Sequence, residues 1–136
     1  MTAKLLDYLT ISILRYRLFM EEFKQNELSW NDFEKVAIHV GTILEVNDFP
    51  EARNPAFQLT IDFGETIGIK KTSAQITKRY EKAALINRQI VAVVNFPKKQ
   101  IRKFMSECLV LGAIGNEGDV ILLAPDAKVE NGLRIS

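Results

Sequence analysis

The sequence predicts an all-β domain, a small barrel of short strands with one short internal helix and a helical extension at its N-terminus. Short runs of apolar and β-branched residues recur at close spacing from residue 36 onward. Glycine, proline and asparagine separate these runs and mark turns. The chain has 136 residues, of which 47% are hydrophobic and 26% charged, as in one ordinary soluble domain.

The first predicted strand is long and begins at residue 36. Val36, Ile38 and Val40 alternate with smaller or polar residues, and Gly41 marks a bend or bulge. Two prolines and turn-forming residues then interrupt the pattern over residues 47–55. The later segments with strand character are 56–64, 66–73, 88–97, 106–114 and 119–125.

One internal segment, residues 73–86, has helical character. Three strands, a helix and two further strands form the order of an OB-fold, a five-stranded Greek-key barrel that commonly binds oligonucleotides. The segment 88–97 is apolar almost throughout, so we expect it to be a central strand buried on both faces.

The N-terminal residues 1–19 favour an amphipathic helix over a signal peptide. Asp7 interrupts their apolar run, Arg15 and Arg17 end it, and no small-residue cleavage pattern follows. The run is also too short and too charged to cross a bilayer. We expect a helical extension over 1–31, the barrel domain over 32–136 and no membrane insertion. The apolar positions at roughly helical spacing are Leu5, Leu6, Leu9, Ile13 and Leu14.

Several classes of site are disfavoured by composition. The single cysteine, Cys108, excludes a disulfide within one chain, and with the single histidine, His39, it argues against a zinc enzyme. We expect Cys108 to be a buried structural thiol and His39 a surface residue. No spacing indicates a catalytic triad or a phosphate loop. The sequence therefore predicts no enzyme, no cofactor and no metal, and a reducing cytoplasmic location.

Charge is strongly segregated although the net charge is only +1. Residues 70–103 hold ten of the eighteen basic residues against Glu81 alone, a local balance of +9. The rest of the chain carries eight basic and sixteen acidic residues, a balance of −8. Two interpretations stay open for this pattern: a solvated basic face, or a surface that binds phosphates through clustered Lys and Arg.

Four stretches resemble the tRNA-binding domain family: "VGTILEVNDFPEARNPAFQLTIDFG", "IGIKKTSAQITKRY", "LINRQIVAVVNFP" and "SECLVLGAI". The resemblance covers roughly residues 32–136 and includes every predicted strand in order. Within the family, the chain looks most like the CsaA secretion chaperones, which consist of this domain alone. The resemblance implies an OB-fold core, a homodimer, and two activities: binding tRNA, and binding unfolded or export-bound polypeptides.

The resemblance also implies site residues. Arg53 lies in the matching loop "FPEARNP", and Lys99 follows "NFP" where relatives usually have arginine. The chain departs from the family pattern at Lys98, a frequent proline, at Lys103, usually glycine, and at His39, commonly arginine. The residues expected to bind RNA are Arg53, Lys78, Arg79, Lys98, Lys99, Arg102 and Ser106.

The predicted function is that of a non-catalytic tRNA-binding protein that also serves as a protein-export chaperone. The alternative is a polypeptide-binding secretion chaperone with no physiological RNA role. For polypeptides we expect an apolar groove, with Phe104 exposed and Phe96, which follows a buried strand, more in the core. The residues expected to line this groove are Phe49, Phe96, Phe104 and Met105.

Overall fold

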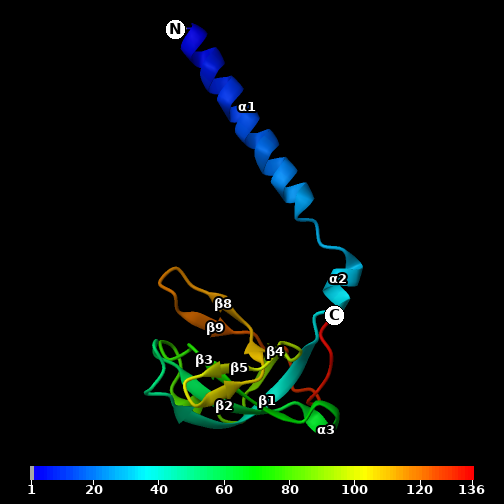
Figure 1. The fold of residues 1–136 in the computed structure, drawn as a ribbon, viewed down its shortest axis with the longest axis vertical. Coiled ribbons are helices and arrows are strands. Elements are labelled where there is room, and N and C mark those ends of the chain that lie inside the picture. Colours follow the sequence, from blue (N-terminus) through cyan, green and yellow to red (C-terminus); the bar gives the residue numbers. More distant parts are fainter. Residues whose placement is uncertain (1) are drawn as a thin grey trace. The chain divides into compact units, whose positions relative to one another are not determined.

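The computed structural model describes the backbone of residues 2–136 and the side chains of residues 7–136. The chain divides into two compact units, of which the first ends at Lys35 and the second is Val36–Ser136. The first unit contains helices α1 (Thr2–Gln25) and α2 (Trp30–Glu34) (Figure 1). In α2 the Ser29 hydroxyl caps the helix by accepting a hydrogen bond from the Asp32 amide at 3.1 Å.

The predicted N-terminal helix is confirmed and continues six residues beyond residue 19, to Gln25. Of its predicted apolar positions, the side chains of Leu5 and Leu6 lie outside the described part, whereas the other three are exposed. None of the helices in residues 2–136 combines the length and the apolar character needed to cross a membrane.

The second unit is a nearly closed barrel of five antiparallel strands (Figure 1). Their order in the sheet is β3-β2-β1-β4-β7, and every neighbouring pair is antiparallel. The predicted all-β OB-fold is therefore confirmed. The five strands are β1 (Ile38–Asp48), β2 (Phe57–Asp62), β3 (Ile69–Ala74), β4 (Gln89–Val93) and β7 (Leu109–Val110).

Two hairpins and two single-turn helices complete the second unit. β5 (Lys99–Ile101) pairs with β6 (Phe104–Ser106), and β8 (Gly112–Ile114) pairs with β9 (Val120–Leu122). Helix α3 (Gly64–Ile67) lies between β2 and β3, and α4 (Lys82–Leu85) precedes β4.

The barrel interior follows from the alternation seen in the sequence. On β2, Phe57, Leu59 and Ile61 are buried while the residues between them are half-buried, as expected for a strand with one face on the core. The predicted central strand is confirmed, since Ile90–Val93 of β4 are all buried. The sheet thus has a continuous apolar core.

Gly41 was expected to mark a bend, but the structure explains the glycine by close packing. A Cβ atom there would lie 2.6 Å from the Ile61 side chain and 2.7 Å from that of Phe63, so only glycine lets β1 approach these residues. The irregularity in β1 comes later, where its register to β2 shifts between Ile43 and Glu45.

The predicted helix over residues 73–86 is wrong over most of its length. Ser73 and Ala74 belong to β3, where Ala74 pairs with Phe57 of β2, and only Lys82–Leu85 are helical. Residues 75–81 form turns and irregular backbone. The strand pairing of Ser73 and Ala74 satisfies backbone groups that a helix starting there would have used internally.

The barrel closes between β3 and residues 106–108, which we call the seam. The Thr72 hydroxyl donates a hydrogen bond to the Cys108 carbonyl at 2.6 Å and lies 3.1 Å from Ser106 Oγ. The Glu107 amide donates to the Lys71 carbonyl at 2.7 Å. The seam fixes the point at which the chain returns to the barrel after the β5–β6 hairpin.

The single cysteine and the single histidine both lie within the barrel structure. Cys108 is buried as predicted, and burial raises the pKa of its thiol to about 11. His39 is half-buried instead of lying on the open surface. Its Nδ1 is 2.9 Å from the Gly132 carbonyl, because the C-terminal segment pairs with β1 beside it. Neither side chain is placed for catalysis.

Candidate nucleic-acid interface

An OB-fold offers ligands the outer face of its second and third strands and the two loops beside them, the first between strands one and two and the second between strands four and five. Here the first is residues 49–56, which we call the front loop. The second runs from residue 94 to 108 and contains the β5–β6 hairpin. Lys98, Lys99, Arg102 and Lys103 therefore lie in one of the two loops that this fold uses for binding.

We call residues 98–106 the basic hairpin. Its strands pair Lys99 with Ser106 and Ile101 with Phe104, so Arg102 and Lys103 form a two-residue turn at the tip. Arg102 adopts a positive φ of 56°, a conformation that two-residue hairpin turns require and that non-glycine residues seldom adopt. No glycine or asparagine at the tip indicates this hairpin in the sequence, and its two strands were not predicted.

All four cations of the basic hairpin are exposed: Lys98, Lys99, Arg102 and Lys103. Lys98 has one loose ion pair, its Nζ lying 3.7 Å from the Glu107 carboxylate. Lys99 and Lys103 have no ion-pair partner among residues 7–136. An anion arriving at this hairpin would thus meet several cations that the protein itself leaves unneutralised.

The tip of the basic hairpin packs against the front loop. Arg102 Nε donates a hydrogen bond to the Glu51 carbonyl at 3.2 Å. The rings of Phe49 and Phe104 lie 5.4 Å apart with an interplanar angle of 56°, a favourable tilted arrangement. These two contacts connect segments about fifty residues apart and hold the cationic tip over the outer face of the barrel.

A cavity of about 720 Å³ opens between the two loops, and we call it the loop cavity. Gln58 contributes to its wall from the outer face of β2, since its neighbours Phe57 and Leu59 point into the core. The lining combines two aromatic rings with one amide, one acidic and two basic residues. Its residues are Phe49, Glu51, Gln58, Arg102, Lys103 and Phe104.

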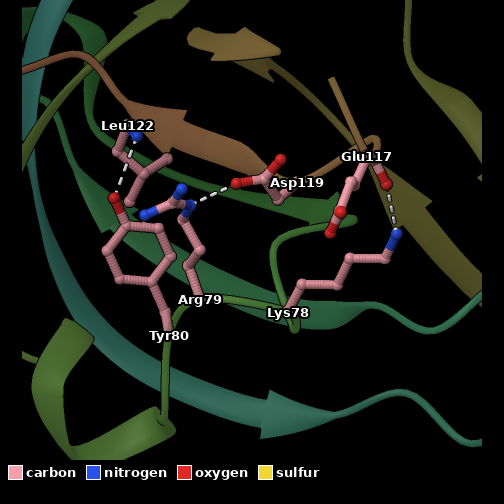
Figure 2. Close-up of polar contacts among 6 residues, drawn as sticks. All are labelled: Lys78, Arg79, Tyr80, Glu117, Asp119 and Leu122. Atoms are coloured by element: carbon pink, nitrogen blue, oxygen red, sulfur yellow. Dashed lines mark hydrogen bonds and ion pairs between the residues drawn. The ribbon is translucent and has the colours of Figure 1, made fainter. Parts of the chain in front are cut away.

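Two of the predicted RNA-binding residues are bound to another part of the protein. Lys78 Nζ donates to the Glu117 carbonyl at 2.7 Å, and Arg79 Nε donates to the Asp119 carboxylate (Figure 2). The adjacent Tyr80 hydroxyl accepts a hydrogen bond from the Leu122 amide at 3.0 Å. Three consecutive side chains thereby tie the segment after β3 to the β8–β9 hairpin.

The ion pair with Asp119 changes the electrostatics of Arg79. Hydrogen bonding and charge from Arg79 hold the pKa of the Asp119 carboxyl below its usual range, so this carboxylate stays ionised beside the guanidinium. The positive charge of Arg79 is largely compensated, in contrast to that of Lys99 or Lys103. The basic residues of the 70–103 cluster therefore differ: Arg79 is paired with a carboxylate, whereas Lys99 and Lys103 have no ion-pair partner among residues 7–136.

The remaining two predicted RNA-binding residues lie in different settings. Arg53 is exposed on the front loop and lines a smaller cavity of about 390 Å³ together with Phe49 and Thr77. Ser106 lies at the seam, where its Oγ is 3.1 Å from Thr72 Oγ1 and 3.3 Å from the Ser73 amide. Its position indicates a part in barrel closure.

The predicted apolar groove is only partly assembled. Phe49 and Phe104 pack together, but Phe49 is 5% exposed and Phe104 is half-buried against it, so the expected exposure of Phe104 is wrong. Phe96, expected in the core, is 54% exposed because β4 ends at Val93, before the chain reaches it. Met105 is exposed and, as the strand neighbour of Phe104, points to the opposite face.

Sequence reasoning missed Gln58 and Glu51 as lining residues of the loop cavity. For Gln58 a signal was available, because alternation along "FQLTID" puts it on the outer face of the second strand, which an OB-fold uses for binding. No sequence signal identified Glu51, whose position depends on the contact between the front loop and the hairpin tip.

A second large cavity, of about 710 Å³, lies between β1, β4 and residues 124–131. Two of its polar side chains are hydrogen-bonded to the C-terminal segment. The Thr42 hydroxyl donates to Asn131 Oδ1 at 2.6 Å, and Gln89 Nε2 donates to the Val129 carbonyl at 2.7 Å. These bonds attach the C-terminal segment to the barrel, so this cavity is better explained by structure than by ligand binding.

The five-stranded barrel with its basic hairpin is an OB-fold, and comparison with known proteins places it in a family. Residues 38–134 match the family model described as "Putative tRNA binding domain", and the chain belongs to that family, as its sequence indicated.

Solved structures of CsaA chaperones are similar over most of the chain. The crystal structure of chaperone CsaA from Bacillus anthracis str. Ames is 50% identical, with a TM-score of 0.77, and the match covers 81% of this chain and 99% of that one. The CsaA chaperone protein from Picrophilus torridus is 55% identical, with a TM-score of 0.76, covering 81% and 100%. The predicted similarity to CsaA proteins within the family is thereby confirmed.

Curated relatives include methionine–tRNA ligases. That of Acidithiobacillus ferrooxidans (strain ATCC 53993 / BNL-5-31) is 34% identical over 105 residues, which is 77% of this chain. That of Pyrococcus abyssi (strain GE5 / Orsay) is 32% identical over 115 residues, or 85% of this chain. In both cases the match spans only 15% of the ligase, so it concerns one domain of those enzymes.

Proposed function

We propose that this chain is a non-catalytic RNA-binding protein that holds the backbone of tRNA on the surface formed by the basic hairpin and the front loop. One observation carries the proposal: four exposed cations, with a single loose ion pair to any residue in 7–136, occupy a loop that OB-folds use for nucleic acids. The family match and the methionine–tRNA ligases, enzymes that act on tRNA, support the choice of tRNA.

The proposed mechanism is electrostatic. Lysine contacts phosphate as a point charge and carries no base information, so the lysines position the RNA without reading its sequence. Each phosphate neutralised releases condensed counterions, which makes affinity fall as salt rises. Four contacts from the basic hairpin would give a slope of log K against log salt of about −3 to −4.

The other predicted residues contribute to RNA binding to different degrees. Arg53 extends the cationic surface along the front loop, since it is exposed there. Lys78 and Arg79 hold the β8–β9 turn and offer RNA only their remaining donor groups. Ser106 acts on the surface indirectly, by fixing the end of the basic hairpin at the seam.

We further propose that the protein works in the cytoplasm as a homodimer. Large apolar side chains are exposed on β7 and on the β8–β9 hairpin, at 38–79% of their area, and a second copy of this chain would cover them. Two RNA surfaces on one rigid body gain avidity through effective concentration. The exposed residues are Leu109, Ile114, Ile121 and Leu123.

The second candidate function is a secretion chaperone that binds unfolded or export-bound polypeptides and has no physiological RNA role. The similarity to CsaA chaperones favours it, as do the exposed Phe96 and Met105. The two functions depend differently on salt. Binding of phosphates weakens steeply as salt rises, whereas binding of apolar segments persists or strengthens.

The experiment that tests the proposal is a fluorescence titration with bulk tRNA across a salt series, with and without a denatured model protein as competitor. We expect affinity to fall with the slope given above, and the competitor to leave it unchanged. Weak binding with little salt dependence, together with suppressed aggregation of the denatured protein, would contradict the RNA function and support the chaperone.

A further inference from the structure

We propose that the loop cavity accepts one unpaired nucleobase of the bound RNA, while the hairpin tip holds the phosphates on either side of it. This inference rests on the RNA-binding function proposed above and adds a ligand class to it. The protein would then prefer RNA with unstacked, single-stranded nucleotides over fully paired duplex of equal charge.

The size and floor of the loop cavity fit a planar base. Its volume of about 720 Å³ is within the range of roughly 300–1,000 Å³ that is usual for small-molecule sites. Phe49 and Phe104 supply a floor of two packed rings. Stacking on aromatic side chains accepts any base, since every base has a π-face.

Gln58 offers the cavity a polar group suited to the edge of a base. Its carboxamide is both a donor and an acceptor, the combination that the edge of a nucleobase presents. Among the described residues it has no hydrogen-bond partner, yet none of its polar atoms is fully buried, so water satisfies it in the free protein. Replacing that water by a base edge would cost no bond within the protein.

Arg102 and Lys103 contribute two positive charges to the lining of the same cavity, against the one negative charge of Glu51. The bond from Arg102 Nε to the Glu51 carbonyl fixes the guanidinium at the contact between the two loops, and its terminal N–H groups lie beyond that bond. Lys103 is the next residue at the tip and has no ion-pair partner among residues 7–136. A base on the aromatic floor would bring its own phosphates to these two cations.

This arrangement favours RNA over the apolar side chain of a polypeptide. An apolar side chain would bind to the two rings alone, and the two basic residues Arg102 and Lys103 would not strengthen its binding. The same arrangement favours unpaired nucleotides over duplex. A base in a paired helix is stacked on both faces, and pulling it out of the helix has a free-energy cost that an unpaired base avoids.

The test is a fluorescence anisotropy titration of the full chain with two RNAs that carry the same number of phosphates. One is a twelve-nucleotide single strand that cannot pair with itself, and the other is a fully paired duplex. The variants are Gln58→Ala, Phe104→Leu and Lys99→Glu, with Gln75→Ala, an exposed glutamine that does not line the cavity, as matched control.

We expect the wild type to bind the single strand roughly tenfold more tightly than the duplex, in line with the measured worth of base–aromatic stacking. Gln58→Ala and Phe104→Leu should remove most of this preference without changing the salt slope. Lys99→Glu should weaken both RNAs alike, and Gln75→Ala should change neither. Gln58 is on the barrel surface, so its variant reports on the site even if Phe104→Leu fails to fold.

Two results would overturn the inference, and they differ in what they leave standing. If both RNAs bind equally, depend on Lys99 and ignore Gln58 and Phe104, the base site is wrong and the RNA function stands. If neither RNA binds, and the cavity variants instead weaken binding of a denatured polypeptide, both proposals are wrong and the cavity takes an apolar side chain.

Discussion

The hydroxyl of Thr72 should make a measurable contribution to closing the barrel. Thr72 is 1% exposed, and its Oγ1 donates to the Cys108 carbonyl at 2.6 Å across the seam. Thr72→Val keeps the side-chain shape and removes this donor. A buried carbonyl that loses its partner costs about 1–3 kcal/mol, so we expect the free energy of unfolding to fall by that amount.

Urea and thermal unfolding, followed by far-ultraviolet circular dichroism, measure this change. For a domain of this size each kcal/mol lowers Tm by roughly 4–8 °C. The matched control is Thr60→Val on β2, because Thr60 is half-buried on the outer face and carries no seam contact. The reasoning is refuted if Thr72→Val and Thr60→Val are equally stable.

Three further predictions concern packing, the thiol and assembly. Gly41→Ala should lower the free energy of unfolding by about 1–3 kcal/mol, measured by urea unfolding, since its new methyl group meets Ile61 and Phe63; an unchanged midpoint would contradict the close approach. The raised pKa of Cys108 means that the unfolded chain ionises first, so stability should decline as pH rises from about 9 toward 11. At pH 8 Cys108 should resist a thiol reagent in the folded protein, and rapid labelling without unfolding would be evidence against burial. Ile114→Asp with Ile121→Asp should convert a dimer to a monomer in light scattering, whereas an unchanged mass would exclude this surface as the interface.

The sequence was most informative where a single strand contains its own signal. Alternation over residues 36–46 and 56–62 correctly predicted β1 and β2, and the uniform apolar run predicted the buried β4. These patterns are local, because every second side chain of a strand points to the same face and the face on the core is apolar. The OB-fold followed from their order and from the family resemblance together.

The sequence was least informative where a segment takes its structure from a distant partner. Residues 73–74 begin a segment with helical character in the sequence, but Ala74 pairs in β3 with Phe57 of β2, seventeen residues earlier in the chain. The basic hairpin has no glycine at its tip, and Arg102 adopts the positive φ that the turn needs. Neither outcome can be read from propensity, since tertiary contacts decide both.

The candidate site shows the same division. The cluster of cations was visible in the sequence, but its separation into two groups was not. That separation depends on Glu117 and Asp119, about forty residues beyond Lys78 and Arg79. The exposures of Phe96 and Phe104 were assigned the wrong way round, because the end of β4 and the packing of Phe104 on Phe49 are both set by the folded barrel.

The central claim is that the basic hairpin binds RNA phosphates, and charge reversal tests it most directly. The measurement is tRNA affinity across a salt series for wild type and for Lys99→Glu combined with Arg102→Glu. The matched control is Arg88→Glu combined with Lys128→Glu, which changes net charge equally at the cavity between β1, β4 and residues 124–131.

We predict that the hairpin variant loses tRNA affinity. The slope of its log K against log salt should become less negative by about 1.5–2, which is the share of two phosphate contacts. The control should keep the wild-type slope and most of the affinity. An unchanged affinity and slope in the hairpin variant, or an equal loss in both variants, would contradict the claim that this hairpin is the RNA-binding surface.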